Sequence, residues 1–175
     1  MALTGQLLIA GEKVATSETF FAINPTTGES LQPPFSVADV VIVDRACDLA
    51  WQAFDEFRQL SAAMRATFIE QIAEQILALS DELLERAHLE SGLPMARLIS
   101  ERGRTVGQLR LFADELRKGG WLGVRIDPAI PDRNPLPRSD LRQQKIPLGP
   151  VAVFGASNFP LAFSVAGSDT AAALE

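Results

Sequence analysis

The chain has 175 residues, of which 47% are hydrophobic and 22% charged, a globular composition long enough for one ordinary domain or a piece of a larger one. Its formal net charge of −6 argues against nucleic acid or an acidic membrane as the main partner. The single cysteine excludes an internal disulfide and favours a reducing, cytoplasmic location, and no run approaches the roughly 18 apolar residues of a membrane span.

Two small hairpins are predicted at the start of the chain. Residues 6–14 contain a short strand, a tight turn and a returning strand. Residues 19–23 are rich in Phe and Ile and predict another strand, followed by the turn cluster 24–28. In that cluster Pro25 fixes φ, and Gly28 is free to take a positive φ. Ordinary surface hairpins would give the same pattern.

A first helix is predicted between residues 40 and 57. It follows Ser36 and Asp39, which have the spacing of a capping box. Its apolar residues recur at steps of three and four, which predicts one buried face. Cys47 lies in the middle of this face, so we expect a small core hydrophobe there and no nucleophile. The face consists of Val40, Val43, Cys47, Ala50, Phe54 and Phe57.

A second helix begins at Ser61, and a continuation capped by Ser80 ends at Gly92. His88 is the only histidine; with no second ligand at a suitable spacing, we expect no metal site. The stripe of the second helix that we expect to be buried consists of Met64, Phe68, Ile72, Ile76 and Leu79.

Pro94 suits the first turn of the next helical region. The pattern predicts a short piece at 95–101, a bend at Gly103 and a longer amphipathic piece at 105–118, which Gly119 ends. The inward-facing residues of the longer piece are Val106, Leu109, Phe112, Ala113 and Leu116.

A long, polar, two-stranded arm is predicted after this helix. Residues 121–126 form one strand and 139–147 the other, joined by the rigid segment 127–137 with its four prolines. Such an arm has unpaired edges that tend to pair with a partner. A plain surface hairpin is the alternative.

The most informative stretch is 149–160. Residues 151–154 form an apolar run typical of a strand buried on both faces. Small residues follow, then Asn158, then Pro160 at the start of a helix that we expect to reach residue 174. Ligands bind at the carboxyl ends of strands in open parallel sheets, so chemistry is expected here. The alternative is plain scaffold with Asn158 as a helix cap.

The motif Asn158-Phe159-Pro160 after this strand resembles the aldehyde dehydrogenase superfamily. Most members have Pro-Trp where this chain has Ala156-Ser157. With residues 161–167, the motif resembles the branch of NAD(P)-dependent α-ketoglutaric semialdehyde (2,5-dioxovalerate) dehydrogenases. The fatty aldehyde dehydrogenases of luminous bacteria are close relatives of that branch.

The resemblance implies an α/β fold with small hairpins, helices, a protruding β arm and the first strand and helix of a parallel nucleotide-binding sheet. Residues 1–128 would be the N-terminal part of the cofactor-binding domain, 129–147 an oligomerisation arm, and 148–175 that first strand and helix. We therefore expect an N-terminal piece of a longer chain, whose catalytic Cys and general-base Glu would lie beyond residue 175.

The resemblance also assigns roles. Asn158 would supply the oxyanion-hole amide, Phe159 and Phe163 would line the substrate channel, and Arg104 would meet the distal carboxylate of the substrate. A solvated helix arginine, or an ion pair of Arg104 with Glu101, is the alternative. The nicotinamide-ribose side of NADP or NAD would lie along Phe154, Gly155, Ala156 and Ser157.

The function implied for the full-length protein is oxidation of a small-molecule aldehyde, α-ketoglutaric semialdehyde, to 2-oxoglutarate by a homo-oligomer, a dimer or a tetramer. This chain alone would be inactive because it lacks the nucleophile. The alternatives are another aldehyde dehydrogenase, such as a fatty aldehyde enzyme, and a non-catalytic helical interaction domain with a β arm.

Overall fold

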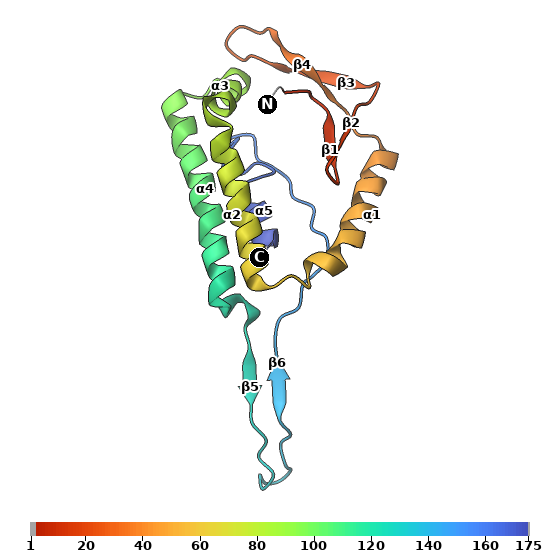
Figure 1. Cartoon of the computed structure of the whole chain (residues 1–175), viewed down its shortest axis with the longest axis vertical. Coiled ribbons are helices and arrows are strands. Elements are labelled where there is room, and N and C mark those ends of the chain that lie inside the picture. The colour runs from red at the N-terminus through yellow and green to blue at the C-terminus, as the bar shows by residue number, and fades with distance from the viewer. Residues whose placement is uncertain (1–2, 175) are drawn as a thin grey trace.

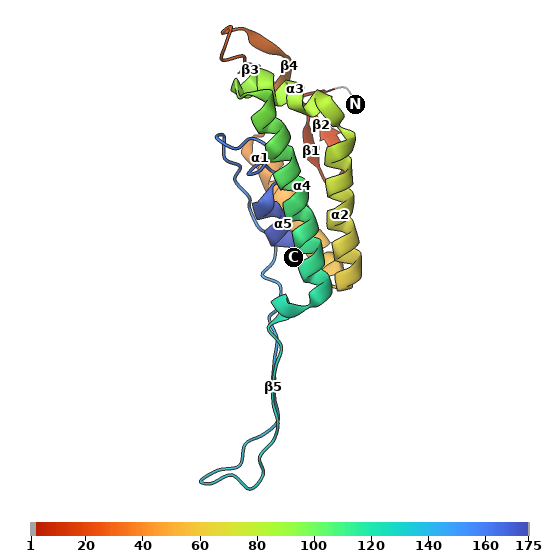
Figure 2. The same cartoon turned by 90° about the vertical axis from the view of Figure 1, so that its left-hand side faces the viewer.

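The computed structural model describes residues 3–174 and contains small antiparallel hairpins around a helical body (Figures 1 and 2). Both predicted N-terminal hairpins are confirmed. Strand β1 (Leu7–Ile9) pairs with β2 (Glu12–Val14), and β3 (Thr19–Ile23) pairs with β4 (Ser30–Ser36). The turn between β3 and β4 uses Gly28 at φ +74°.

The first helix, α1 (Val40–Phe57), forms where predicted but is capped and packed differently. Its N-cap is Asp39, whose carboxylate accepts from the Ile42 N–H at 2.8 Å, while Ser36 ends β4. None of its described residues is buried, and Cys47 is exposed. The prediction of a core face was wrong because almost no other described element covers it; Phe57 does meet Phe68, with ring centroids 6.0 Å apart.

The core lies between α2 (Ala62–Ala78) and α4 (Met95–Lys118), which run side by side in both views (Figures 1 and 2). Ser61 caps α2 as predicted. The stripe expected to be buried was partly wrong, since Met64, Phe68 and Leu79 are exposed. Small alanines let the two helices approach closely along another face of α2. The core cluster comprises Ala66, Ile69, Ala73, Val106, Leu109, Ala113, Leu116 and Ala171.

Helices α3 (Ser80–Ser91) and α4 end as predicted, at Gly92 and Gly119, both left-handed. The expected cap at Ser80 was wrong, because Leu79 is the N-cap and makes no side-chain cap bond. The expected bend at Gly103 was also wrong: α4 is one continuous helix of 24 residues. A mid-helix glycine costs only about 1 kcal/mol relative to alanine, and burial of the flanking residues outweighs that cost.

A narrow hairpin projects from the end of α4 (Figures 1 and 2). After a 3-10 turn, η1 (Gly120–Leu122), strand β5 (Arg125–Asp127) pairs antiparallel with β6 (Leu141–Gln143). Both strands are shorter than predicted, and the hairpin starts before residue 129.

The segment 149–174 departs most from prediction. Residues 151–156 are extended but unpaired, Phe154 is 87% exposed, and turns occupy 157–167 before α5 (Ser168–Leu174). The prediction of a strand buried on both faces was wrong for this structure, because among residues 3–174 no other strand pairs with it. The helix also starts later than residue 161, because the 157–167 segment folds back on itself.

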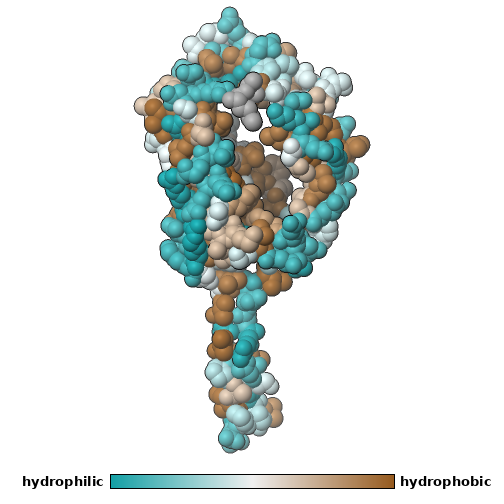
Figure 3. Space-filling view, in the orientation of Figure 1, coloured by the Kyte–Doolittle hydropathy of each residue, from teal (hydrophilic) through white to brown (hydrophobic). Residues whose placement is uncertain are grey.

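The molecule is hollowed between α1 and the α2–α4 pair, and brown hydrophobic side chains line the hollow (Figure 3). Apolar side chains from the end of α1 and the start of α2 line a pocket here, among them Phe57, Met64 and Phe68. No helix in the described part of the chain is long and apolar enough to cross a bilayer.

Candidate functional site

Asn158 is exposed and lies in a loop that is fastened to α4. The guanidinium of Arg97 donates from Nη2 to the Asn158 carbonyl at 2.5 Å. The same guanidinium stands over the Phe159 ring, 4.9 Å from its centroid. The backbone that presents the predicted oxyanion donor is therefore tied to the first turns of a rigid helix.

The loop after the extended segment closes on itself. The Ala156 N–H donates to the Phe163 carbonyl at 2.7 Å, and the Phe163 N–H donates to the Phe159 carbonyl at 3.0 Å. The rings of Phe159 and Phe163 meet edge to face, with centroids 5.4 Å apart. Two of the predicted substrate residues thus form one aromatic unit beside Asn158.

Glycine is required where this loop packs on itself. A Cβ at Gly167 would lie 2.4 Å from the Ala162 carbonyl oxygen, and one at Gly155 would lie 3.2 Å from the Phe163 carbonyl oxygen. Gly155 therefore has a local packing role, in addition to the cofactor role predicted from the sequence.

Two buried polar residues of α4 form hydrogen bonds with the backbone of the loop. The Glu101 carboxylate, 5% exposed, accepts from Arg97 Nε at 3.1 Å and from the Leu161 N–H at 3.3 Å. The Thr105 hydroxyl, 3% exposed as a residue, lies 3.0 Å from the Leu161 carbonyl. Sequence reasoning missed Arg97, Glu101 and Thr105 as site residues; their four-residue spacing on one helix face is the signal that could have found them.

Arg104 lies on the exposed side of α4 with its guanidinium 5.1 Å from the Phe163 ring centroid. The ion pair with Glu101 considered as an alternative does not form, because the Glu101 carboxylate pairs with Arg97. Among the described ion pairs none involves Arg104, and its exposed guanidinium packs on the Phe163 ring.

A pocket of about 980 Å³ lies beside Asn158. Its walls are α3, the start of α4 and residues 157–161, and Arg86, Arg97 and Glu90 are its ionisable lining residues. Asn158 and Phe159 line it, whereas Phe163 and Arg104 do not. The structure therefore brings three of the predicted site residues, Ser157, Asn158 and Phe159, to one concave surface.

The predicted cofactor segment is accessible along its length. Phe154, Gly155, Ala156 and Ser157 are all exposed, the first three in the extended segment and Ser157 at the start of the turns that follow it. Three of them are small, so a planar ring could approach the backbone closely. The role of this segment in cofactor binding remains a prediction from the resemblance.

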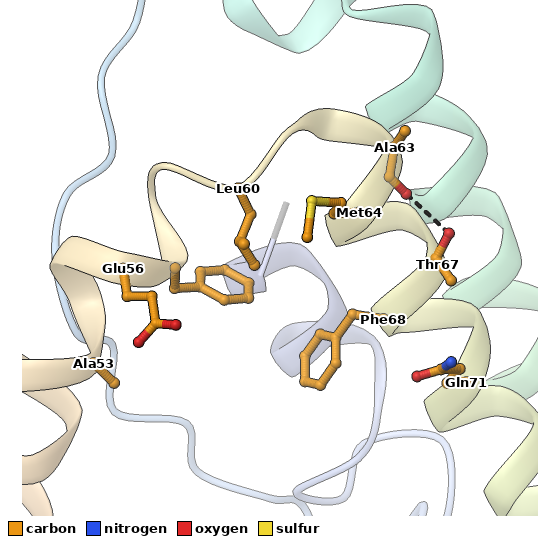
Figure 4. A pocket seen from close by; sticks show the side chains of 9 residues that line it. Ala53, Glu56, Leu60, Ala63, Met64, Thr67, Phe68 and Gln71 are labelled. Atoms are coloured by element: carbon orange, nitrogen blue, oxygen red, sulfur yellow. Dashed lines mark hydrogen bonds between the residues drawn. The ribbon is translucent and has the colours of Figure 1, made fainter.

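A second pocket, of about 620 Å³, lies between the end of α1 and the first turns of α2. In Figure 4, Leu60, Met64 and Phe68 point toward one another across it. Among the described residues that line it, Glu56 is the single ionisable one. This surface can hold apolar groups, but no cationic side chain is among the described residues that line it.

The shifted pKa values lie far from the loop. Hydrogen bonding to Arg117 lowers the pKa of the Glu70 carboxyl and, reciprocally, raises the pKa of Arg117. The two side chains form a bidentate pair with both distances at 2.6 Å. Since Arg117 follows Arg97 by 20 positions on α4, the two sites are roughly 30 Å apart along the helix.

The family of the chain is shown by comparison with known proteins. The sequence model described as the aldehyde dehydrogenase family matches residues 13–174. The chain belongs to that family.

Two curated relatives and one solved structure define the similarity further. The chain is 61% identical to α-ketoglutaric semialdehyde dehydrogenase 2 of Azospirillum brasilense, over 99% of this chain and 34% of the relative. It is 52% identical to α-ketoglutaric semialdehyde dehydrogenase of Acinetobacter baylyi, over 97% and 32%. A crystal structure of an E. coli NADP-dependent enzyme superposes with a TM-score of 0.83 at 26% identity, over 97% of this chain and 34% of that one. The chain spans about a third of the length of these proteins.

Proposed function

We propose that the full-length protein containing this chain oxidises α-ketoglutaric semialdehyde to 2-oxoglutarate with NAD or NADP as hydride acceptor. The observation that carries the proposal is the identity of 61% and 52% to two enzymes of that name, along nearly the whole chain. The family membership supports aldehyde oxidation with a nicotinamide cofactor in general.

In the proposed reaction a cysteine thiolate forms a bond to the aldehyde carbon, and the aldehyde oxygen becomes an oxyanion. A nicotinamide cofactor held along residues 154–157 would supply the acceptor for the hydride that leaves this carbon. Water then breaks the resulting thioester, so that aldehyde, water and NAD(P)⁺ give carboxylate, NAD(P)H and two protons. The thiolate and the general base that activates the water are assigned to residues outside this chain, and Cys47 takes no part.

Within this chain, the side chain that would stabilise the oxyanion is Asn158. Its side-chain N–H is a neutral donor, and a donor aimed at the developing oxyanion stabilises the transition state more than the substrate. The backbone of residues 154–157 would run along the nicotinamide-ribose, and Phe159 and Phe163 would face the aldehyde. Self-association through the β arm and a cytoplasmic location belong to the same proposal, on the sequence arguments given above.

The test is Asn158→Ala in the full-length enzyme, assayed with α-ketoglutaric semialdehyde and either cofactor. Losing one oxyanion donor should lower kcat by about 10²–10³ with little change in KM for the cofactor. Asn134→Ala, which truncates an exposed amide in the β arm, is the matched control and should leave kcat unaltered. An unchanged kcat in Asn158→Ala would reject the assignment, and a preference for long-chain aldehydes over the semialdehyde would reject the substrate.

A further inference from the structure

We propose that Arg97, Glu101 and Thr105 are positioning residues that set the aim of the Asn158 amide. The inference rests on the proposed function, since it assumes that Asn158 is the oxyanion donor. It concerns α4 residues that do not themselves need to touch the substrate.

The first step is the spacing of the three residues. They stand four apart on a straight helix, so their side chains emerge in a row on one face. The row meets the loop in chain order, because Arg97 holds residue 158, whereas Glu101 and Thr105 both hold residue 161. The contacts at residues 158 and 161 thus hold the backbone on both sides of Phe159 and Pro160 against α4.

The second step is the geometry at Arg97. Its guanidinium bridges two groups, donating from Nε to the Glu101 carboxylate at 3.1 Å and from Nη2 to the Asn158 carbonyl at 2.5 Å. The planar fork of arginine suits two acceptors at fixed angles, whereas the ammonium of lysine is a point charge. Arg97 therefore links the Asn158 backbone to a buried carboxylate, so that the location of Glu101 determines the location of Asn158.

The third step concerns burial. A buried carboxylate loses its hydration and persists only when it is paired and hydrogen-bonded. Glu101, at 5% exposure, is paired on one oxygen with Arg97 and on the other with the Leu161 N–H. An apolar contact could hold this loop without the cost of desolvating a carboxylate, but it would not fix the orientation of the backbone. The polar arrangement fixes direction, which an oxyanion donor needs.

The fourth step concerns Asn158 itself. Within the described residues, no hydrogen bond involves its side-chain amide, and the residue is exposed. Among the described contacts, those of the backbone are therefore what determines where this amide lies. A displacement of about 1 Å at a reacting centre can cost on the order of 10² in rate, so loosening the backbone should reduce kcat.

The experiment is a double-mutant cycle in the full-length enzyme, with α-ketoglutaric semialdehyde and NADP or NAD. Arg97→Lys keeps a positive charge for Glu101 but removes the bridge to Asn158. We expect it to lower kcat roughly tenfold to a hundredfold in the wild-type background and less than about twofold in Asn158→Ala. KM for the cofactor should stay unchanged. The control is Arg110→Lys, an exposed arginine of the same helix that pairs with Glu74 at 2.7 Å.

Each outcome decides between the two proposals. An equal loss in both backgrounds, or no loss in either, overturns the positioning role while leaving the role of Asn158 intact. If Asn158→Ala itself leaves kcat unchanged, the proposed role of Asn158 fails and the positioning role fails with it. If Arg97→Lys proves unfolded by thermal melting, Thr105→Val replaces it in the same cycle. Thr105→Ser, which retains the hydroxyl, should then rescue kcat, and failure of that rescue overturns the proposal.

Discussion

Replacing Arg104 by leucine tests whether its charge selects the substrate. The guanidinium is exposed and stands over Phe163, and it has no competing carboxylate among the described ion pairs. A semialdehyde with a distal carboxylate could use such a cation, whereas an uncharged aldehyde of the same length could not. We therefore expect Arg104→Leu to raise KM for α-ketoglutaric semialdehyde and to leave KM for pentanal nearly unaltered.

The expected rise in KM can be estimated from the hydrogen bond that the substrate carboxylate would lose. A charge-assisted hydrogen bond contributes about 1.5–3 kcal/mol, and each 1.4 kcal/mol is a factor of ten, so KM should rise about tenfold to a hundredfold. The lost cation–π contact over Phe163 contributes only about 0.5–1 kcal/mol at an exposed site. The variant should therefore remain folded, and the change in KM can be read as a change in binding.

The assay measures steady-state NAD(P)H formation with both aldehydes for wild type, Arg104→Leu and Arg104→Lys. Lysine should retain part of the discrimination, because it keeps the charge but not the fork. Arg110→Leu, on an exposed position of the same helix, is the matched control. Equal weakening for both aldehydes would mean that Arg104 only supports Phe163; weakening for neither would mean that the carboxylate binds elsewhere.

Three further predictions concern other parts of the molecule. Cys47→Ser should leave kcat unchanged, and loss of activity would show that the thiol takes part. Replacing residues 125–143 by a short Gly-Ser link should lower the mass seen in analytical ultracentrifugation, and an unchanged mass would refute self-association through the β arm. For the Glu70–Arg117 pair, the pKa of the Glu70 carboxyl is lowered from 4.5 by Arg117, so its stabilisation is present above pH 4.5 and is lost as pH falls below it. Urea midpoints of wild type and Glu70→Gln should thus differ at neutral pH and converge in acid; a pH-independent difference would contradict this.

Helix ends were predictable from the sequence because their causes are local. Gly92 and Gly119 end helices in the left-handed conformation, and Ser61 caps α2 through its own hydroxyl. Each depends on a few neighbouring residues and on no distant contact. The same locality explains the error at Ser36, since Asp39 offered an equally good cap three residues later.

Buried faces were less predictable because they depend on what packs across them. The apolar periodicity of α1 is real, yet Cys47 is exposed because almost nothing among the described residues covers that face. Likewise, residues 151–154 have a strand composition but no partner ladder in residues 3–174. Periodicity indicates which side chains could be buried, whereas burial itself requires a second surface.

The motif that contains Asn158 is visible in the sequence, but the groups that hold its backbone are not. The motif 158–160 is contiguous and therefore visible in the sequence, whereas Arg97 and Asn158 are separated by 61 positions. Helix α4 connects the hydrophobic core with the loop that carries Asn158. Its C-terminal half is buried against α2 through Leu109, Ala113 and Leu116, and its N-terminal half carries the polar row that meets the loop. A continuous helix about 36 Å long thus joins the packed core to the backbone of the loop that carries Asn158.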